Sequence, residues 1–319
     1  MPYELGGTGI LGVAFETTYG TYIAPTKWIP IRSESLTEVE DKIYRTNIRG
    51  LADRSGAIQG YTHIEGDIEF EATADNLLYF LYAMRVNVAK TGAGPYVYTY
   101  TPAHVASPTT AAGANVRKSL SILAVRTARP FGYLGCNVTR LSIRIDNGLM
   151  LCTATIMGIT ETQQAAPGAP TWPTTPPFGP LHNAIEIPNA TARTDIDTFT
   201  LDIDDGGEAA NRIKTTGGRG PSFIQWGERE ITMSMEHDFD ALTDYDTFLN
   251  QTIQAIELSG TENATTNKVS FLINATVVDS YQVNLSGLGD LVRASVAYHG
   301  IHNTADIYTI VVNSAESIT

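Results

Sequence analysis

Residues 61–72 read Tyr-Thr-His-Ile-Glu-Gly-Asp-Ile-Glu-Phe-Glu-Ala, and their polar and apolar side chains alternate. Carboxylates occupy one parity, and the large apolar side chains occupy the other. This period-two pattern predicts a strand with one wet face and one packed face. Residues 228–237 repeat it. Both segments are about twice the usual ~5–6 residues, which favours a large sheet or barrel.

A short helix is predicted after each of these strands. In the first, Thr73 or Asp75 can cap the N-terminus, and an apolar stripe follows at helical spacing, namely Leu77, Leu81 and Met84. The second helix is predicted to begin near Asp240 or Thr243, with its apolar side chains facing inward, namely Tyr245, Phe248 and Leu249. We expect both helices to cover one face of a sheet.

The two halves of the chain resemble one another in the order of their segments. Residues 58–81 match residues 224–249, residues 119–123 match 269–273, and residues 149–159 match 291–301. The pattern favours a duplicated domain. The alternative is chance similarity between two β-rich segments.

Charge and proline content place a boundary between the halves. The 319-residue chain has 21 basic and 34 acidic residues, a net charge of −13. Residues 1–165 are balanced, whereas residues 166–319 hold the whole acidic excess. Residues 166–182 are proline-rich, which predicts a semi-stiff linker. We therefore expect an arm at 1–30, domains at 31–165 and 183–319, and the linker between them.

Composition excludes several classes of protein. There is no apolar run of 18 residues, so we expect no spanning helix and no membrane partner. The first residues lack the basic and apolar regions of a signal peptide. The acidic balance argues against a protein that grips nucleic-acid phosphates with clustered lysines and arginines.

No motif predicts catalysis, a cofactor or a metal. Residues 7–12 fit the G-x-G-x-x-G pattern, but no strand precedes them, so a glycine-rich arm is the better interpretation. Residues 202–208 lack the spacing of a calcium loop, and the six histidines are scattered. We therefore predict that the protein is not an enzyme.

The two cysteines lie on either side of a predicted hairpin. Asn147-Gly148 suits the positive φ angles of a type I′ turn. In that register Cys152 faces Ile143 and Cys136 faces Ile159, so the thiols do not meet. Free thiols fit assembly in a reducing cytoplasm.

The order of segments resembles the tail tube proteins of long-tailed bacteriophages. The resemblance rests on residues 12–21, 25–30, 33–36, 49–50 and 60–70 in the first half and on 199–203, 220–221, 228–236 and 244–245 in the second. It implies a mainly β fold of two tandem β-sandwich tube domains, each with one short flanking helix. It also implies inner sheets that join into a ring-wide β-barrel.

The resemblance further implies a virion protein whose stacked rings form a hollow tail tube, through which double-stranded DNA passes without specific binding. Its partners would be other copies of itself and the terminator, tape measure and tail tip proteins. A duplicated chain favours a trimeric ring with pseudo-sixfold symmetry over a hexameric one. The alternatives are another ring-forming tail component (terminator, hub or decoration protein) or a β-rich binding module.

The polar parity of the two long strands supplies candidates for the wall of the channel. An acidic wall repels DNA phosphates weakly and prevents adhesion. The other interpretation is that these carboxylates solvate the outer wall. The candidates are Glu65, Glu69, Glu71, Glu228, Glu230, Glu236 and Asp238. In a stacked assembly, we expect the N-terminal arm and residues 90–116 to make ring-to-ring contacts.

Overall fold

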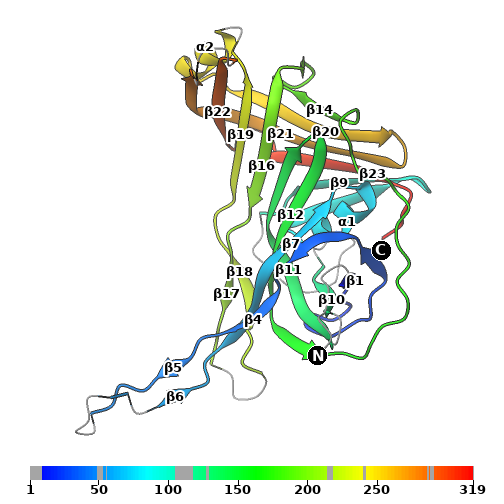
Figure 1. The fold of residues 1–319 in the computed structure, drawn as a ribbon, viewed down its shortest axis with the longest axis vertical. Helices are drawn as coiled ribbons and strands as arrows, with labels where there is room; N and C mark the ends of the chain where they lie inside the picture. The colour runs from blue at the N-terminus through cyan, green and yellow to red at the C-terminus, as the bar shows by residue number, and fades with distance from the viewer. Residues whose placement is uncertain are drawn as a thin grey trace.

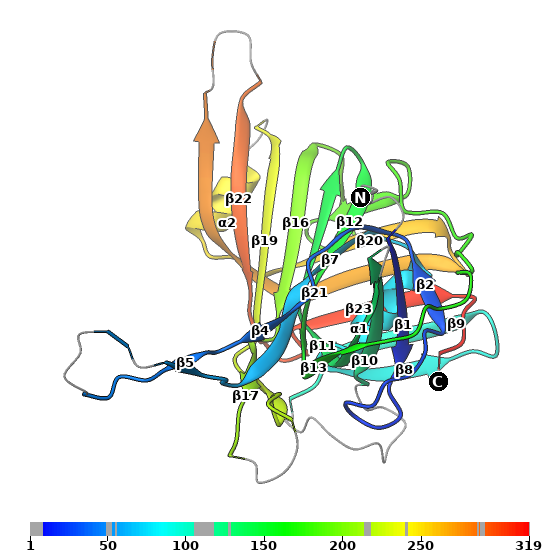
Figure 2. The ribbon, with the colours of Figure 1, turned by 60° about the horizontal axis from the view of Figure 1, so that its bottom comes forward.

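The computed structural model describes residues 9–318, apart from 49–52, 55, 105–117, 127–128, 214–217, 240–241, 286 and 288–290. The described chain is mainly β, as predicted, with two short helices. Most strands belong to one antiparallel network that curves around a common core (Figures 1 and 2).

A continuous sheet, here called the long sheet, runs through both halves of the chain. Its order from one edge to the other is β3/β4, β7, β12, β11, β16, β19, β22, β21. The halves join where β11 pairs with β16. The strands are β3 (Ile31–Glu34), β4 (Thr37–Glu40), β7 (Thr62–Glu71), β11 (Arg129–Asp146), β12 (Leu149–Gly158), β16 (Ile196–Asp204), β19 (Glu230–Asp238), β21 (Asn267–Asn284) and β22 (Arg293–Gly300).

The two longest strands, β11 and β21, have 18 residues each. Only the second half of each strand belongs to the long sheet, and the first half pairs with other strands. The first half of β11 pairs with β10 (Leu120–Arg126) and β13 (Thr160–Gln163), and β10 continues to β1 (Ile10–Phe15) and β2 (Lys27–Ile29). The first half of β21 pairs with β20 (Gln254–Asn263) and β23 (Tyr308–Ser314). Beyond them lie β14 (Asn183–Glu186), β15 (Ala192–Arg193), β9 (Tyr96–Pro102) and β8 (Val86–Thr91).

Two short hairpins lie outside this network. They are β5 (Ile43–Tyr44) with β6 (Ala57–Ile58), and β17 (Gly207–Ala210) with β18 (Phe223–Trp226). The β5–β6 hairpin stands away from the body of the molecule at the lower left of Figure 1.

The first helix lies in the core. α1 (Ala74–Tyr82) begins after Thr73, whose hydroxyl accepts a hydrogen bond from the Asn76 amide at 3.1 Å, as predicted. Every residue of α1 is buried, because β21 and β23 of the second half pack against it as well as β1, β8 and β11. The helix is therefore buried on all sides, and not only along the predicted apolar stripe.

The second helix is exposed, which corrects the prediction of three inward-facing side chains. α2 (Thr243–Leu249) buries only Asp244, while Tyr245 and Leu249 are 39% and 58% exposed. Phe248 alone of the predicted three packs against the core. No side chain caps α2, whose N-cap residue is Leu242. Asp240 lies outside the described residues.

The N-terminal segment is not a free arm from residue 10 onward. Leu11 and Val13 of β1 are fully buried, and β1 pairs with β10 over six residues. Glu16 fixes the chain that follows, because its carboxylate accepts from the amides of Gly20 and Gly135, each at 2.7 Å. The prediction failed because residues 11–14 of β1 are all buried, so the strand has no polar and apolar alternation to reveal it. Residues 1–8, including Gly7 and Thr8 of the glycine motif, lie outside the described residues.

The proline-rich linker has no regular structure, but it is anchored. Phe178 is fully buried, and its backbone donates to the Ala72 carbonyl and accepts from the Met150 amide. Its ring lies so close to Gly260 that a Cβ there would be 2.8 Å away. The linker is therefore packed across both halves.

The hairpin at Asn147-Gly148 is confirmed by positive φ angles of 51° and 78°. Cys152 faces Ile143 as predicted. A bulge between Val138 and Arg140 shifts the rest of the register by one residue. Cys136 therefore lies beside Gly158 rather than Ile159. Both thiols are free and buried, and burial raises their pKa values.

Neither helix in the described ranges is long and apolar enough to cross a lipid bilayer.

A charged sheet face as the candidate functional site

The face of the long sheet that points away from the core is polar and is here called the charged face. One row of side chains crosses it from strand to strand, each residue directly opposite the next. None of the members of this row is buried. From β3 to β22 the row is Ser33, Glu69, Thr153, Ser142, Asp202, Thr232 and His299.

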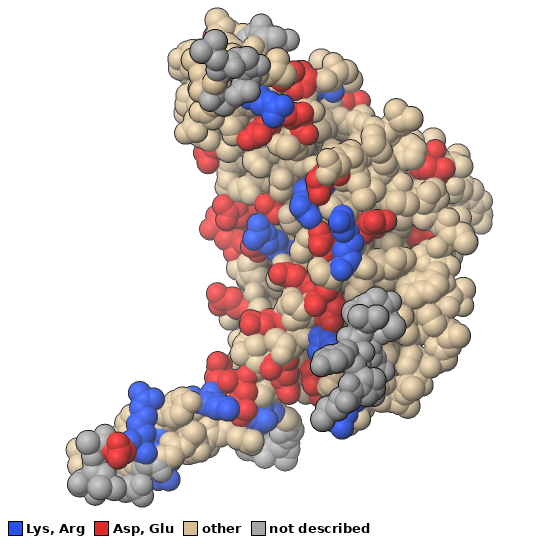
Figure 3. All heavy atoms as spheres, in the orientation of Figure 1, with Lys and Arg blue, Asp and Glu red and all other residues tan. Residues whose placement is uncertain are grey.

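Acidic side chains outnumber basic ones on the charged face, and arginines lie between them. Arg144 pairs with Glu69 at 2.5 Å, and Arg140 pairs with Asp202 at 3.2 Å. The hydrogen bond from Arg144 lowers the pKa of Glu69, so this carboxylate stays ionised. In Figure 3 the charged residues gather in a band along the hollowed left side, whereas the right side is mostly uncharged.

The structure places the predicted carboxylates on or next to this face. Glu65, Glu230 and Glu236 are exposed, and Glu69, Glu71 and Asp238 are half-buried in the same two strands. Glu228 is exposed two residues before β19. Because β7 and β19 are separated by β12, β11 and β16, the candidates form two groups rather than one cluster.

The predicted candidates did not include the charged residues of the strands between these two groups. Asp202 and Asp204 of β16 and Arg140 and Arg144 of β11 belong to the charged face. The alternation of residues 198–204 carries the same period-two signal and could have revealed β16. Asp67, which accepts a hydrogen bond from Thr155 at 2.7 Å, was left out although it lies within β7.

Buried charge connects the halves behind this face. Asp205 is fully buried and accepts from Arg229 Nε at 2.5 Å and from the Arg85 amide at 3.0 Å. Arg229 also donates to the Arg85 carbonyl, which joins the chain after α1 to the second half. Burial raises the pKa of Asp205, and the attraction of Arg229 opposes that shift. This group makes contacts only within the protein and presents no open site.

A second charged cluster lies beneath α2. Arg193 donates to Asp195 at 2.6 Å and to Asp244 at 3.1 Å, and buried His237 lies 3.3 Å from Asp244. The hydrogen bond from Arg193 lowers the pKa of Asp195. The cluster fixes the first turn of α2 against β15 and β19.

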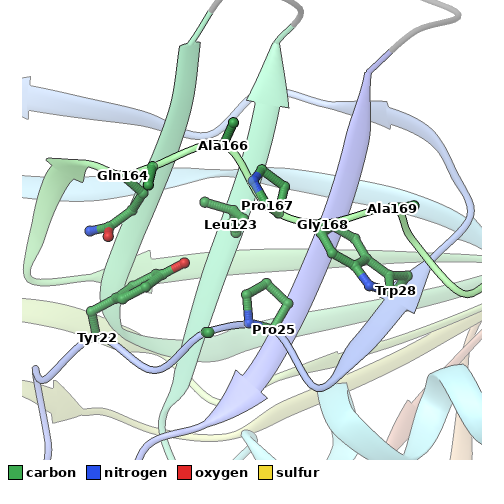
Figure 4. Close-up of a pocket in the computed structure, with 11 residues that line it drawn as sticks. Tyr22, Pro25, Trp28, Leu123, Gln164, Ala166, Pro167, Gly168 and Ala169 are labelled. Atoms are coloured by element: carbon green, nitrogen blue, oxygen red, sulfur yellow. The ribbon is translucent and has the colours of Figure 1, made fainter.

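One open cleft of about 370 Å³ lies between the segment before β2 and the start of the linker (Figure 4). Tyr22, Pro25 and Trp28 form one wall, and residues 164–169 form the other. Tyr22 is the only titratable lining residue, and burial raises its pKa. The cleft therefore offers no acid, base or nucleophile for chemistry at neutral pH.

In the ranges that the structure describes, no group of three or more His, Cys, Asp or Glu side chains is arranged to hold a metal ion. The main feature is instead an extended, partly neutralised charged face on a sheet with two open edges. This combination describes a β protein whose main surface feature is a charged sheet face.

The chain belongs to the phage tail tube protein family, whose model matches residues 6–300. The resemblance stated from the sequence is thereby confirmed over nearly the whole chain. The family supports a structural role in the phage tail and places the protein in the virion. No curated protein matches the chain.

Proposed function

We propose that this protein polymerises as stacked rings into the hollow tail tube, through which genome DNA is delivered. The observation that carries the proposal is the long sheet, which ends at β3/β4 and at β21, where no further strand pairs among the residues that the structure describes. An open edge has unpaired amides and carbonyls that seek a partner, and closure into a barrel removes both edges. Copies joined edge to edge would form a ring-wide β-barrel.

We propose that the charged face lines the channel. Duplex DNA carries one charge per roughly 1.7 Å of its axis, so a wall with excess carboxylates repels it at short range. At physiological salt this repulsion is screened beyond about 8 Å. The arginines that pair with Glu69 and Asp202 leave few free cations to hold phosphates. DNA would then slide without binding, and the seven predicted carboxylates would lie in or beside the wall.

A duplicated tube domain fits the pairing pattern of the strands. β7, β12 and the bulged second half of β11 in the first half have the same mutual pairings as β19, β22 and β21 in the second. In this alignment β10 corresponds to β20, so residues 119–123 do not correspond to 269–273. Three chains would supply six similar units, and we therefore favour a trimeric ring with pseudo-sixfold symmetry over a hexameric one.

We revise which segments are proposed to make the ring-to-ring contacts. Residues 10–15 are used in the core, and residues 105–116 of the predicted contact segment lie outside the described residues. The β5–β6 hairpin is a better candidate, because it stands away from the body and Ile43, Tyr44 and Ile58 are each more than half exposed. We propose that this hairpin contacts the adjacent ring.

Negative-stain electron microscopy over a concentration series tests the proposal. Hollow rings that stack into tubes are the expected result, with threefold averages for a trimeric ring. Single rings that never stack would favour a terminator, hub or decoration protein. A monomer at every concentration would contradict ring assembly and favour a binding module, with the cleft of Figure 4 as its first candidate site.

A further inference from the structure

We propose that the exposed end of β21 with the residue after it, residues 280–285, pairs with the β3/β4 edge, residues 34–39, of a second copy of this chain. The pairing is antiparallel and places Gln282 opposite Thr37 of that copy. The inference rests on the proposed function, since it specifies how neighbouring chains in a ring would join. It is derived from a seam that already exists inside the chain.

The internal seam is the pairing of β11 with β16. It runs over six residue pairs, from Arg140 opposite Asp204 to Ile145 opposite Phe199. In its middle, Ser142 lies opposite Asp202 on the charged face. This seam shows which edges of the two halves fit together and in which register.

The end of β21 occupies the position in the second half that the end of β11 occupies in the first. Each strand pairs with the strand after it through a long antiparallel hairpin, and each has one bulge in that pairing. The bulges lie between Val138 and Arg140 in β11 and between Val278 and Ser280 in β21. Matching them residue by residue places Gln282 at the position of Ser142.

The β3/β4 edge occupies the position in the first half that β16 occupies in the second. β3 pairs with β7 through a bulge between Ile31 and Ser33, and β16 pairs with β19 through a bulge between Ile196 and Thr198. Matching these bulges aligns β3 with β16. The alignment extends to β4, because β4 pairs with β7 in the same register as the part of β3 after its bulge. Thr37 then takes the position of Asp202.

Transfer of the internal register to the two edges gives a seam of six residue pairs between copies. Within one chain the Leu36 carbonyl accepts from Arg126 and Tyr133, so pairing at this residue exchanges those donors for the partner strand. Gln282 and Thr37 take the places of Ser142 and Asp202. The predicted pairs, with the residue of β21 first and the residue of the second copy after it, are Ser280–Val39, Tyr281–Glu38, Gln282–Thr37, Val283–Leu36, Asn284–Ser35 and Leu285–Glu34.

The chemistry of β21 fits an edge that continues as a sheet. The residues that take the positions of core-facing Leu141 and Ile143 in the internal seam, and the next one of the same parity, are also apolar. Of these, Val283 and Leu285 are 40% and 83% exposed. Leu141 and Ile143, by contrast, are fully buried. An apolar row of this kind is stabilised when a partner strand and its layer remove it from water.

The exposure of α2 points to the same partner. Tyr245 of α2 contacts Tyr281, with ring centroids 5.6 Å apart, so the exposed apolar surface of the helix continues onto the β21 edge. α1, its counterpart, is buried because strands of the other half cover it. In a ring, the first half of the next copy would cover α2 in the same way.

Thiol cross-linking of assembled protein tests the register. The double variant Gln282→Cys/Thr37→Cys is treated with a short bis-maleimide, and the products are separated by denaturing electrophoresis. The two natural cysteines are fully buried and do not interfere. The expected result is a ladder of covalent oligomers that ends at the ring size. An equal mixture of the two single variants should give cross-linked dimers only.

The internal seam provides the matched control. Ser142→Cys/Asp202→Cys should form a cross-link within one chain, so the product should have the mass of a single chain. Tubes that form from the double variant without any intermolecular link would overturn the seam and leave the tube function standing. Unsubstituted protein that forms no ring or tube would overturn the proposed function, and the seam with it.

A charge placed on the edge gives a second readout. Val283→Lys should reduce the fraction of protein in rings at least tenfold, because the lysine would lie against buried Leu36 of the next copy. Leu181→Lys is the control, since Leu181 is 96% exposed and lies outside both edges. Equal assembly of the two variants, with Val283→Lys still folded by circular dichroism, would contradict the seam.

Discussion

At the residue scale, a buried carboxylate adds a polar link between the two halves of the chain. Asp205 accepts hydrogen bonds from Arg229 of the second half and from the Arg85 amide of the first. Both partners are needed, because an isolated buried charge is far more costly than a paired one. Sequence reasoning missed Asp205, since it adjoins the run of acidic residues in β16 that faces water.

We predict that Asp205→Ala lowers the free energy of unfolding by about 3–5 kcal/mol, because it leaves Arg229 buried without its counter-ion. Urea unfolding followed by fluorescence measures the change. Glu208→Ala, at an exposed position nearby, should change stability by less than about 0.5 kcal/mol. Equal effects of the two substitutions would show that Asp205 does not join the halves.

Acid sensitivity follows from Asp195. Its folded pKa lies below the ordinary 3.8 because Arg193 donates to it, so its contribution to stability is complete above that value. As the pH falls below 3.8 toward the folded pKa, the carboxylate is protonated and the contribution is lost. Asp195→Asn should therefore lose less stability than the unsubstituted protein between about pH 5 and pH 2. Parallel losses in urea titrations at both pH values would contradict this assignment.

At the element scale, the strongest period-two segments and the first helix were predictable. β7 and β19 carry alternation over nine or ten residues, and α1 has a side-chain cap that accepts the predicted kind of hydrogen bond. The surroundings of these elements were not predictable. α1 is buried by strands that lie far away in sequence, and β1 is apolar throughout its buried middle, so it has no period-two pattern.

Two truncations of different length distinguish a dispensable N-terminal arm from a strand of the core. We predict that removal of residues 1–8 leaves a folded protein, whereas removal of residues 1–24 causes a large loss of stability. The longer truncation deletes β1 and with it buried Leu11 and Val13, and losing one such leucine alone costs about 2–5 kcal/mol. Thermal unfolding by circular dichroism tests this, and equal melting temperatures for the two truncations would show that β1 is dispensable.

The β5–β6 hairpin should matter for stacking but not for folding. We expect that replacing residues 43–58 by a short Gly-Ser turn leaves rings that fail to form tubes, because Ile43, Tyr44 and Ile58 are exposed in the single chain. Electron micrographs compare the lengths of the assemblies. A matched replacement of residues 211–219, between β17 and β18 in the sequence, shows whether the effect is specific to the β5–β6 hairpin. Tubes of normal length would contradict the proposed contact.

At the scale of the whole molecule, the two halves are joined into one long sheet rather than connected only by a linker. The sequence predicted the boundary from charge and prolines, but Phe178 packs the linker into the body and β11 pairs directly with β16. Strand pairing between halves depends on contacts between residues about 60 apart in β11–β16 and about 210 apart in β9–β23, and no single-sequence pattern reports them. The charged face was predicted on its two alternating strands and missed on the strands between them for the same reason.

The charge of this face sets its expected role in DNA passage. We predict that Glu69→Lys and Glu236→Lys together leave rings intact but slow DNA ejection and make it salt-dependent, because new cations on the wall would bind phosphates. Ejection from phage particles that carry the variant tube subunit measures the rate at two salt concentrations. Glu208→Lys, outside the long sheet, is the control. Unchanged ejection from the double variant would place these carboxylates outside the channel.

A reconstruction of the assembled tube by electron cryomicroscopy tests the central claim most directly. We predict stacked rings in which the long sheets of neighbouring copies form one barrel, with Glu69 and Glu236 facing the channel. Tubes with these two carboxylates on the outer wall would contradict the account.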